Sequence, residues 1–162
     1  MLKYVPDDTS VVFSEIPDQI CLAINISGCP HKCLGCHSPY LRDDIGEELT
    51  IPVLEKLIKK NQGITCVLFM GGDSDKEYLT TLSSYITGFG LLVGWYSGED
   101  YLDLDIYRNH FDYIKVGSYK KEMGPLNCKT TNQRLYKIIN RENIKDITCR
   151  FWLKDIIELP MV

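Results

Sequence analysis

The sequence predicts an α/β fold built on a mainly parallel sheet. Segments rich in strand-forming residues alternate along the chain with segments of helical periodicity, and glycines or helix caps separate them. Three chemically distinctive segments, 29–36, 71–73 and 96–98, each follow a predicted strand. Because loops at the carboxyl ends of parallel strands converge on a ligand, we expect these segments to form one site.

Two strands and a helix are predicted in the first sixty residues. Residues 11–13 and 20–26 are apolar and rich in β-branched side chains, and turn residues follow the second run from position 27. A helix is predicted to begin after Thr50, which can cap it, with Pro52 in the first turn, where proline is tolerated.

The rest of the chain repeats the pattern of strand, loop and helix. Residues 64–70 predict a buried strand that ends at two glycines, and the segment 74–77 has the form of a capping box before a helix. Further strands are predicted at 91–96, 113–116 and 148–153. The threonines at 130 and 131 predict the start of a helix carrying Leu135, Ile138 and Ile139.

Length and charge limit the classes of function. The 162 residues predict a single domain over 1–162. The chain has 18 Lys and Arg against 22 Asp and Glu, a net charge of −4, so binding to nucleic acid by bulk basicity is not expected. No apolar run approaches the roughly 18 residues of a membrane span, so we expect no membrane insertion. Pro6, Asp7 and Asp8 do not fit a signal peptide, and a cytoplasmic protein is predicted.

The cysteines suggest a metal centre. Seven cysteines cannot all pair, and a reducing cytosol disfavours disulfides. Residues 29–36 read CPHKCLGC, which places Cys29, Cys33 and Cys36 on one short loop. A zinc site completed by His31 or His37 is one interpretation, although structural zinc usually takes two separated pairs of ligands. An iron–sulfur cluster suits the spacing better, because three thiolates leave one iron open to a ligand.

These motifs resemble a known superfamily. The C-x3-C-x2-C spacing after a strand, with Gly71-Gly72-Asp73 after a later one, resembles the radical S-adenosylmethionine (SAM) enzymes. Together with Tyr96-Ser97-Gly98 and Thr131-Asn132-Gln133-Arg134, the segment 27–39 is similar to the activating proteins of anaerobic (class III) ribonucleoside-triphosphate reductases. The resemblance implies a partial (β/α)6 barrel of the radical SAM type.

The resemblance also implies the cofactors and their ligands. The catalytic and metal-binding residues would be Cys29, Cys33 and Cys36, which would hold one [4Fe-4S] cluster whose open iron binds SAM. Residues predicted to contact SAM are Gly35, Cys36, His37, Gly71, Gly72, Asp73 and Ser97. The residue types leave other roles open, since the two glycines suit a turn, Asp73 suits a helix cap and Ser97 suits a strand-end turn.

The implied activity is that of an activase, an oxidoreductase that generates a glycyl radical on another enzyme. The implied partners are the large subunit of the anaerobic reductase and a low-potential electron donor, flavodoxin or ferredoxin. Other radical SAM substrates remain open, namely pyruvate formate-lyase or a small molecule such as a deazaguanine precursor. A non-catalytic zinc-binding module also remains open as an interpretation.

Several residues receive simpler interpretations. Lys115 is predicted to be a solvated charge at the end of a strand. Asn132, Gln133 and Arg134 would face the reductase or shape the radical site, by resemblance. The four cysteines outside the motif are predicted to be small apolar fillers, and they are Cys21, Cys66, Cys128 and Cys149.

Overall fold

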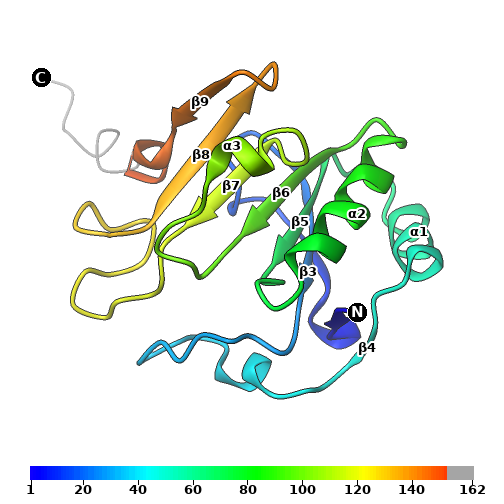
Figure 1. The fold of residues 1–162 in the computed structure, drawn as a ribbon, viewed down its shortest axis with the longest axis horizontal. Helices are drawn as coiled ribbons and strands as arrows, with labels where there is room; N and C mark the ends of the chain where they lie inside the picture. Colours follow the sequence, from blue (N-terminus) through cyan, green and yellow to red (C-terminus); the bar gives the residue numbers. More distant parts are fainter. Residues whose placement is uncertain (153–162) are drawn as a thin grey trace, which may run out of the picture.

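A seven-stranded sheet is the main element of the computed structural model, which describes residues 1–152. Its strand order is β2-β3-β5-β6-β7-β8-β9 (Figure 1). The strands are β2 (Ser10–Val12), β3 (Cys21–Asn25), β5 (Cys66–Met70), β6 (Leu92–Tyr96), β7 (Tyr113–Val116), β8 (Arg134–Ile139) and β9 (Asn143–Asp146). A separate antiparallel pair is formed by β1 (Lys3–Tyr4) and β4 (Glu47–Glu48).

The sheet is mixed rather than mainly parallel. Strands β3, β5, β6 and β7 run in one direction, whereas β2 pairs antiparallel with β3, and β8 and β9 form antiparallel pairs beyond β7. The α/β class is confirmed, but the predicted partial (β/α)6 barrel is wrong. Each parallel step of such a barrel needs a crossover helix, and the chain passes from β7 to β8 and β9 without one.

The helices of the described chain cover one face of the sheet. They are α1 (Ile51–Lys60), α2 (Lys76–Thr87) and the short α3 (Leu104–Tyr107). As predicted, the Thr50 side chain caps α1, accepting a hydrogen bond from the Val53 amide at 3.4 Å. Asp75, rather than the preceding serine, caps α2 by accepting from the Tyr78 amide at 3.1 Å. The buried apolar side chains of α1 and α2 all belong to a single apolar cluster on their side of the sheet (Figure 1).

The opposite face of the sheet has a second apolar core, which no α-helix of the described chain covers. Cys21 and Cys66, which are register partners on β3 and β5, are fully buried there beside Ile16 and Leu68. The prediction of apolar filling is therefore confirmed for these two cysteines. It is wrong for Cys149, which is exposed.

Two predicted elements have the wrong type. The predicted helix carrying Leu135 and Ile138 is strand β8, whose two buried residues belong to the cores on opposite faces of the sheet. Leu135 and Ile138 are three residues apart because both faces of this strand are buried, and not because the segment is a helix. The predicted strand at 148–153 is a 3-10 helix, η3 (Thr148–Trp152), as far as residue 152, and residue 153 lies outside the described part. The Thr148 hydroxyl accepts from the Leu135 amide at 2.8 Å.

Two long loops lie at the carboxyl end of the parallel strands. The loop that follows β3 includes the cysteine motif and the 3-10 helix η2 (Pro39–Arg42), and the loop 117–133 connects β7 to β8. Figure 1 shows both loops projecting from the same end of the sheet. Within residues 1–152, no helix is long and apolar enough to cross a bilayer.

Candidate metal and cofactor site

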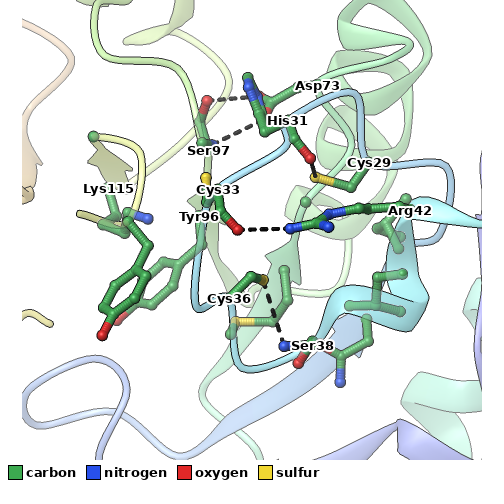
Figure 2. Close-up of a pocket in the computed structure, with 18 of the residues that line it drawn as sticks. Cys29, His31, Cys33, Cys36, Ser38, Arg42, Asp73, Tyr96, Ser97 and Lys115 are labelled. Carbon is green, nitrogen blue, oxygen red and sulfur yellow. Dashed lines mark hydrogen bonds and ion pairs between the residues drawn. The ribbon is translucent and has the colours of Figure 1, made fainter. Parts of the chain in front are cut away.

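The loops after β3, β5, β6 and β7 surround a single pocket, as expected for the carboxyl ends of parallel strands (Figure 2). All three cysteines of the motif line it. The β5 loop contributes Gly71 and Asp73, and the β6 loop contributes Ser97. The chain thus brings together the three segments singled out by the sequence.

Local hydrogen bonds shape the cysteine loop. The Cys29 amide donates to the Leu41 carbonyl at 2.9 Å, which ties the start of the loop to η2. Arg42 donates through Nη2 to the Cys33 carbonyl at 2.6 Å, and the Ser38 amide donates to Cys36 Sγ at 3.4 Å (Figure 2). Desolvation by burial raises the pKa of the Cys29 thiol, and nearby acidic groups add to the effect. A positive charge or a metal in the pocket would oppose this shift.

The two histidines of the motif are engaged with other residues. His31 Nε2 lies 2.8 Å from Asp73 Oδ2. The ring of His37 packs against Tyr119, with ring centroids 5.4 Å apart. His31 lines the pocket together with the three cysteines, with its Nε2 engaged by Asp73, whereas His37 does not line it.

Asp73 is a buried carboxylate with three hydrogen-bond partners. Besides His31, it accepts from the Ser97 hydroxyl at 2.5 Å and from the Gly98 amide at 2.8 Å. Its side chain is almost inaccessible, with 2% of its surface exposed. Charge-assisted hydrogen bonds of this kind offset the cost of removing a carboxylate from water. Asp73 does not cap α2, because Asp75 does so.

The two glycines after β5 have different surroundings. Both have positive φ, 108° for Gly71 and 103° for Gly72, which disfavours other residues. Gly71 lines the pocket, and a Cβ there would lie 3.3 Å from the Ile26 carbonyl oxygen. A Cβ on Gly72 would instead lie 3.0 Å from the Leu79 side chain. Gly72 thus serves the packing of α2.

The burial of Lys115 in the pocket differs from the sequence prediction. The prediction of a solvated lysine is wrong, because Lys115 is 8% exposed and lines the pocket from β7. Within residues 1–152 its ammonium group has no hydrogen bond or ion pair, and it lies 5.6 Å from the centroid of the Tyr96 ring. Desolvation lowers the pKa of Lys115 to about 8, although the charges of Asp73 and the cysteines favour its protonated form.

The segment 132–134 does not start a helix but leads into β8. Gln133 lines the pocket and donates through Nε2 to the Gly117 carbonyl at 3.3 Å. Asn132 donates to the Ser118 carbonyl at 3.0 Å, and Arg134 lies outside the pocket. Of the three residues, only Gln133 is placed to meet a ligand there.

The predicted contact residues fall into two groups. Cys36, Gly71, Asp73 and Ser97 line the pocket, whereas Gly35, His37 and Gly72 do not. Sequence reasoning gave no place in the site to Arg42 or Lys115, which the structure adds to the lining. A charged residue between Ile114 and Val116, within an apolar strand, was the available signal for Lys115.

The position of His31 depends on Gly98, which supplies a testable prediction. A Cβ at residue 98 would lie 2.5 Å from His31 Cδ2. We expect Gly98→Ala to displace the imidazole, weaken its bond to Asp73 and lower the free energy of unfolding by about 1–3 kcal/mol. Urea unfolding of the metal-free protein measures this. If the imidazole is the cause, adding Gly98→Ala to His31→Ala costs much less than it costs in the wild type; an equal cost in both backgrounds would contradict this cause.

Comparison with known proteins adds no assignment to this geometry. No protein-family model, no curated protein and no solved structure matches the chain.

Proposed function

We propose that the protein is a radical SAM activase, in which Cys29, Cys33 and Cys36 hold a [4Fe-4S] cluster and the adjoining pocket binds SAM. Its substrate in this proposal is the large subunit of an anaerobic ribonucleoside-triphosphate reductase, on which it generates a glycyl radical. The observation that carries the proposal is the meeting of three cysteines, Asp73 and Lys115 in one pocket.

The residues that line the pocket fit both the [4Fe-4S] cluster and SAM. Three thiols on one short loop provide the ligands that iron–sulfur clusters prefer. The buried ammonium of Lys115, which has no hydrogen-bond or ion-pair partner among residues 1–152, calls for a negatively charged neighbour. Three cluster thiolates or a ligand carboxylate would meet this need. Asp73 offers the opposite charge, which suits the ammonium of an amino acid such as the methionine part of SAM.

When bound, the [4Fe-4S] cluster and SAM would supply a one-electron reductive cleavage of the SAM sulfonium. The carbon radical so formed would remove a hydrogen atom from the substrate. The protein binds and orients the cluster and SAM. Gly71 gives a ligand access to the backbone at the end of β5, and Ser97 with the Gly98 amide holds the Asp73 carboxylate in place. The buried wall of β6 and β7 excludes water from one side of the pocket.

An external electron is needed for this chemistry, and we assign its supply to a low-potential carrier such as flavodoxin or ferredoxin. The choice of a protein as substrate rests on the resemblance of the motif segments to the activating proteins of anaerobic reductases.

The proposal is tested by anaerobic reconstitution. The protein is loaded with iron and sulfide, reduced with dithionite and incubated with SAM, and 5′-deoxyadenosine is measured. The large reductase subunit is then added and examined for the EPR doublet of a glycyl radical. Cleavage of SAM without that doublet would transfer the proposal to another substrate. A chain that takes up one zinc ion, and neither iron nor sulfide, would overturn it.

A second candidate function has one specific observation in its favour. His31, Asp73 and Glu99 offer ligand atoms that lie within 4.8 Å of one another, which fits a divalent cation and a non-catalytic zinc module. Glu99 is already paired with Lys76 at 2.8 Å, which weighs against a metal there. Zinc binding that survives Cys33→Ala but not His31→Ala would support this candidate.

A further inference from the structure

The two loops that flank the pocket are basic in an otherwise acidic chain. Segments 29–42 and 117–133 together contain five Lys and Arg and one acidic residue, a net charge of +4, whereas the whole chain carries −4. Four of the five basic residues form what we call the basic rim: Lys32, Arg42, Lys120 and Lys121. The rest of the chain therefore carries a net charge of −8, and the two loops around the cysteines differ from it by their net positive charge.

Contacts between the two loops bring the basic rim together. His37 of the cysteine loop packs on Tyr119, and the space beside Gly35 is bounded by Tyr119 at 3.5 Å and by Lys121 at 3.8 Å. Arg42 reaches back to the Cys33 carbonyl. Arg42 and Lys121 thus lie against the cysteine loop, on which Lys32 is the residue before Cys33.

The rim charges are only partly offset by the described chain, since Asp100 interacts electrostatically with Lys120. Within residues 1–152, none of the four side chains forms an ion pair. Lys32, Arg42 and Lys121 are exposed, and between Cys33 and Gly35 the Leu34 side chain is 85% exposed. An exposed apolar side chain on a loop with basic residues is typical of a docking surface with a polar rim. Like charges held close together repel one another, which an acidic partner would relieve.

We propose that the basic rim is the docking surface for an acidic protein that carries a single low-potential electron. This inference rests on the proposed function, because that function requires such a carrier. Docking at the rim places the carrier over the loop that bears all three cysteines. One electron leaves the reduced carrier, which is oxidised, and enters the cluster, which is reduced; no proton transfer or bond cleavage belongs to this step.

Charge reversal on the rim tests the inference. The reconstituted protein is given SAM and one of two reductants, a reduced flavodoxin as the acidic carrier or photoreduced 5-deazariboflavin as a small neutral donor, and 5′-deoxyadenosine is measured. For Lys32→Glu/Lys121→Glu we expect the rate with flavodoxin to fall about tenfold or more at low salt. The rate with the deazaflavin should stay within about twofold, because a neutral donor is not steered by charge.

A matched variant separates position from total charge. Lys56→Glu/Lys145→Glu makes the same change in net charge at two exposed lysines outside both loops, and we expect it to leave both rates nearly unchanged. Salt should slow the flavodoxin reaction of the wild type but have little effect on the rim variant. Equal flavodoxin rates in the wild type and the rim variant overturn the docking surface. Loss of the deazaflavin reaction in the wild type overturns the proposed function instead.

Discussion

Cys33→Ala is expected to lower both the iron and sulfide content of the reconstituted protein and the yield of 5′-deoxyadenosine by at least about 100-fold. The [4Fe-4S] cluster needs three protein ligands, and the two thiolates that remain on the loop cannot hold it. The Cys33 side chain lines the pocket, and the hydrogen bonds that hold this residue in the described chain are made by its carbonyl, which accepts from Arg42 and from the Cys36 amide. Removing the thiol therefore spares these hydrogen bonds. Metal analysis, the visible absorption of the cluster and chromatography of the nucleoside give the measurement.

Cys149→Ala is the matched control for this variant. It also removes one thiol, but Cys149 is exposed on η3 and does not line the pocket. We expect the control to assemble a normal cluster and to cleave SAM at the wild-type rate. Retention of SAM cleavage by Cys33→Ala would contradict the assignment of the three ligands.

Lys115→Met is expected to stabilise the metal-free protein at neutral pH. Desolvation lowers the pKa of Lys115 from 10.5 to about 8, so the folded state holds this proton less tightly than the unfolded state. Such a shift corresponds to about 3 kcal/mol of destabilisation by the charged lysine, which methionine would relieve. Urea unfolding at pH 7 measures the gain. Lys137→Met is the control, because Lys137 also lies over a tyrosine ring, at 5.9 Å from Tyr113, but is exposed.

The sign of the pH dependence follows from the same shift. Below pH 8 Lys115 is charged in both states, and the full penalty is present. Between pH 8 and 10.5 the folded protein loses the proton first, so the contribution of Lys115 to stability rises with pH across this window. We expect the stability difference between Lys115→Met and the wild type to shrink from pH 8 to pH 10. A difference that stays constant would show that the lysine is not buried as a charge.

The gain in stability should come with a loss of binding. In the proposed function the ammonium of Lys115 faces the negative charge of the bound groups, so we expect Lys115→Met to weaken SAM binding about tenfold or more. Equilibrium dialysis with the reconstituted protein gives the dissociation constant. A variant that loses stability and binds SAM normally would assign Lys115 a purely structural role.

Local patterns predicted much of the fold, and long-range pairing accounts for the errors. The central strands and the cap of α1 follow from runs of apolar residues and from Thr50. Strand β8 was missed because Leu135 and Ile138 have a helical spacing, while each is buried in a different core. Which core covers a residue depends on the path of the distant chain, and the sequence pattern does not contain it.

The candidate site also combines residues that local sequence predicts with residues whose positions depend on distant parts of the chain. The grouping of Cys29, Cys33 and Cys36 is local in sequence and was predicted from their spacing, and the ends of β5 and β6 place Asp73 and Ser97 beside them. Lys115 was missed because a lone lysine near a strand end is usually solvated. Its burial arises from the loops on both sides of it, which come from other parts of the chain.

The antiparallel strands at the sides of the sheet also bear on self-association. A closed barrel has no free strand edges, but among residues 1–152 this open sheet has β2 and β9 as edge strands with unpaired backbone groups. β2 is three residues long, and β9 has the sequence Asn-Ile-Lys-Asp with a charged Lys145 facing solvent. Short length at one edge and charge at the other are means by which proteins discourage intermolecular sheet growth.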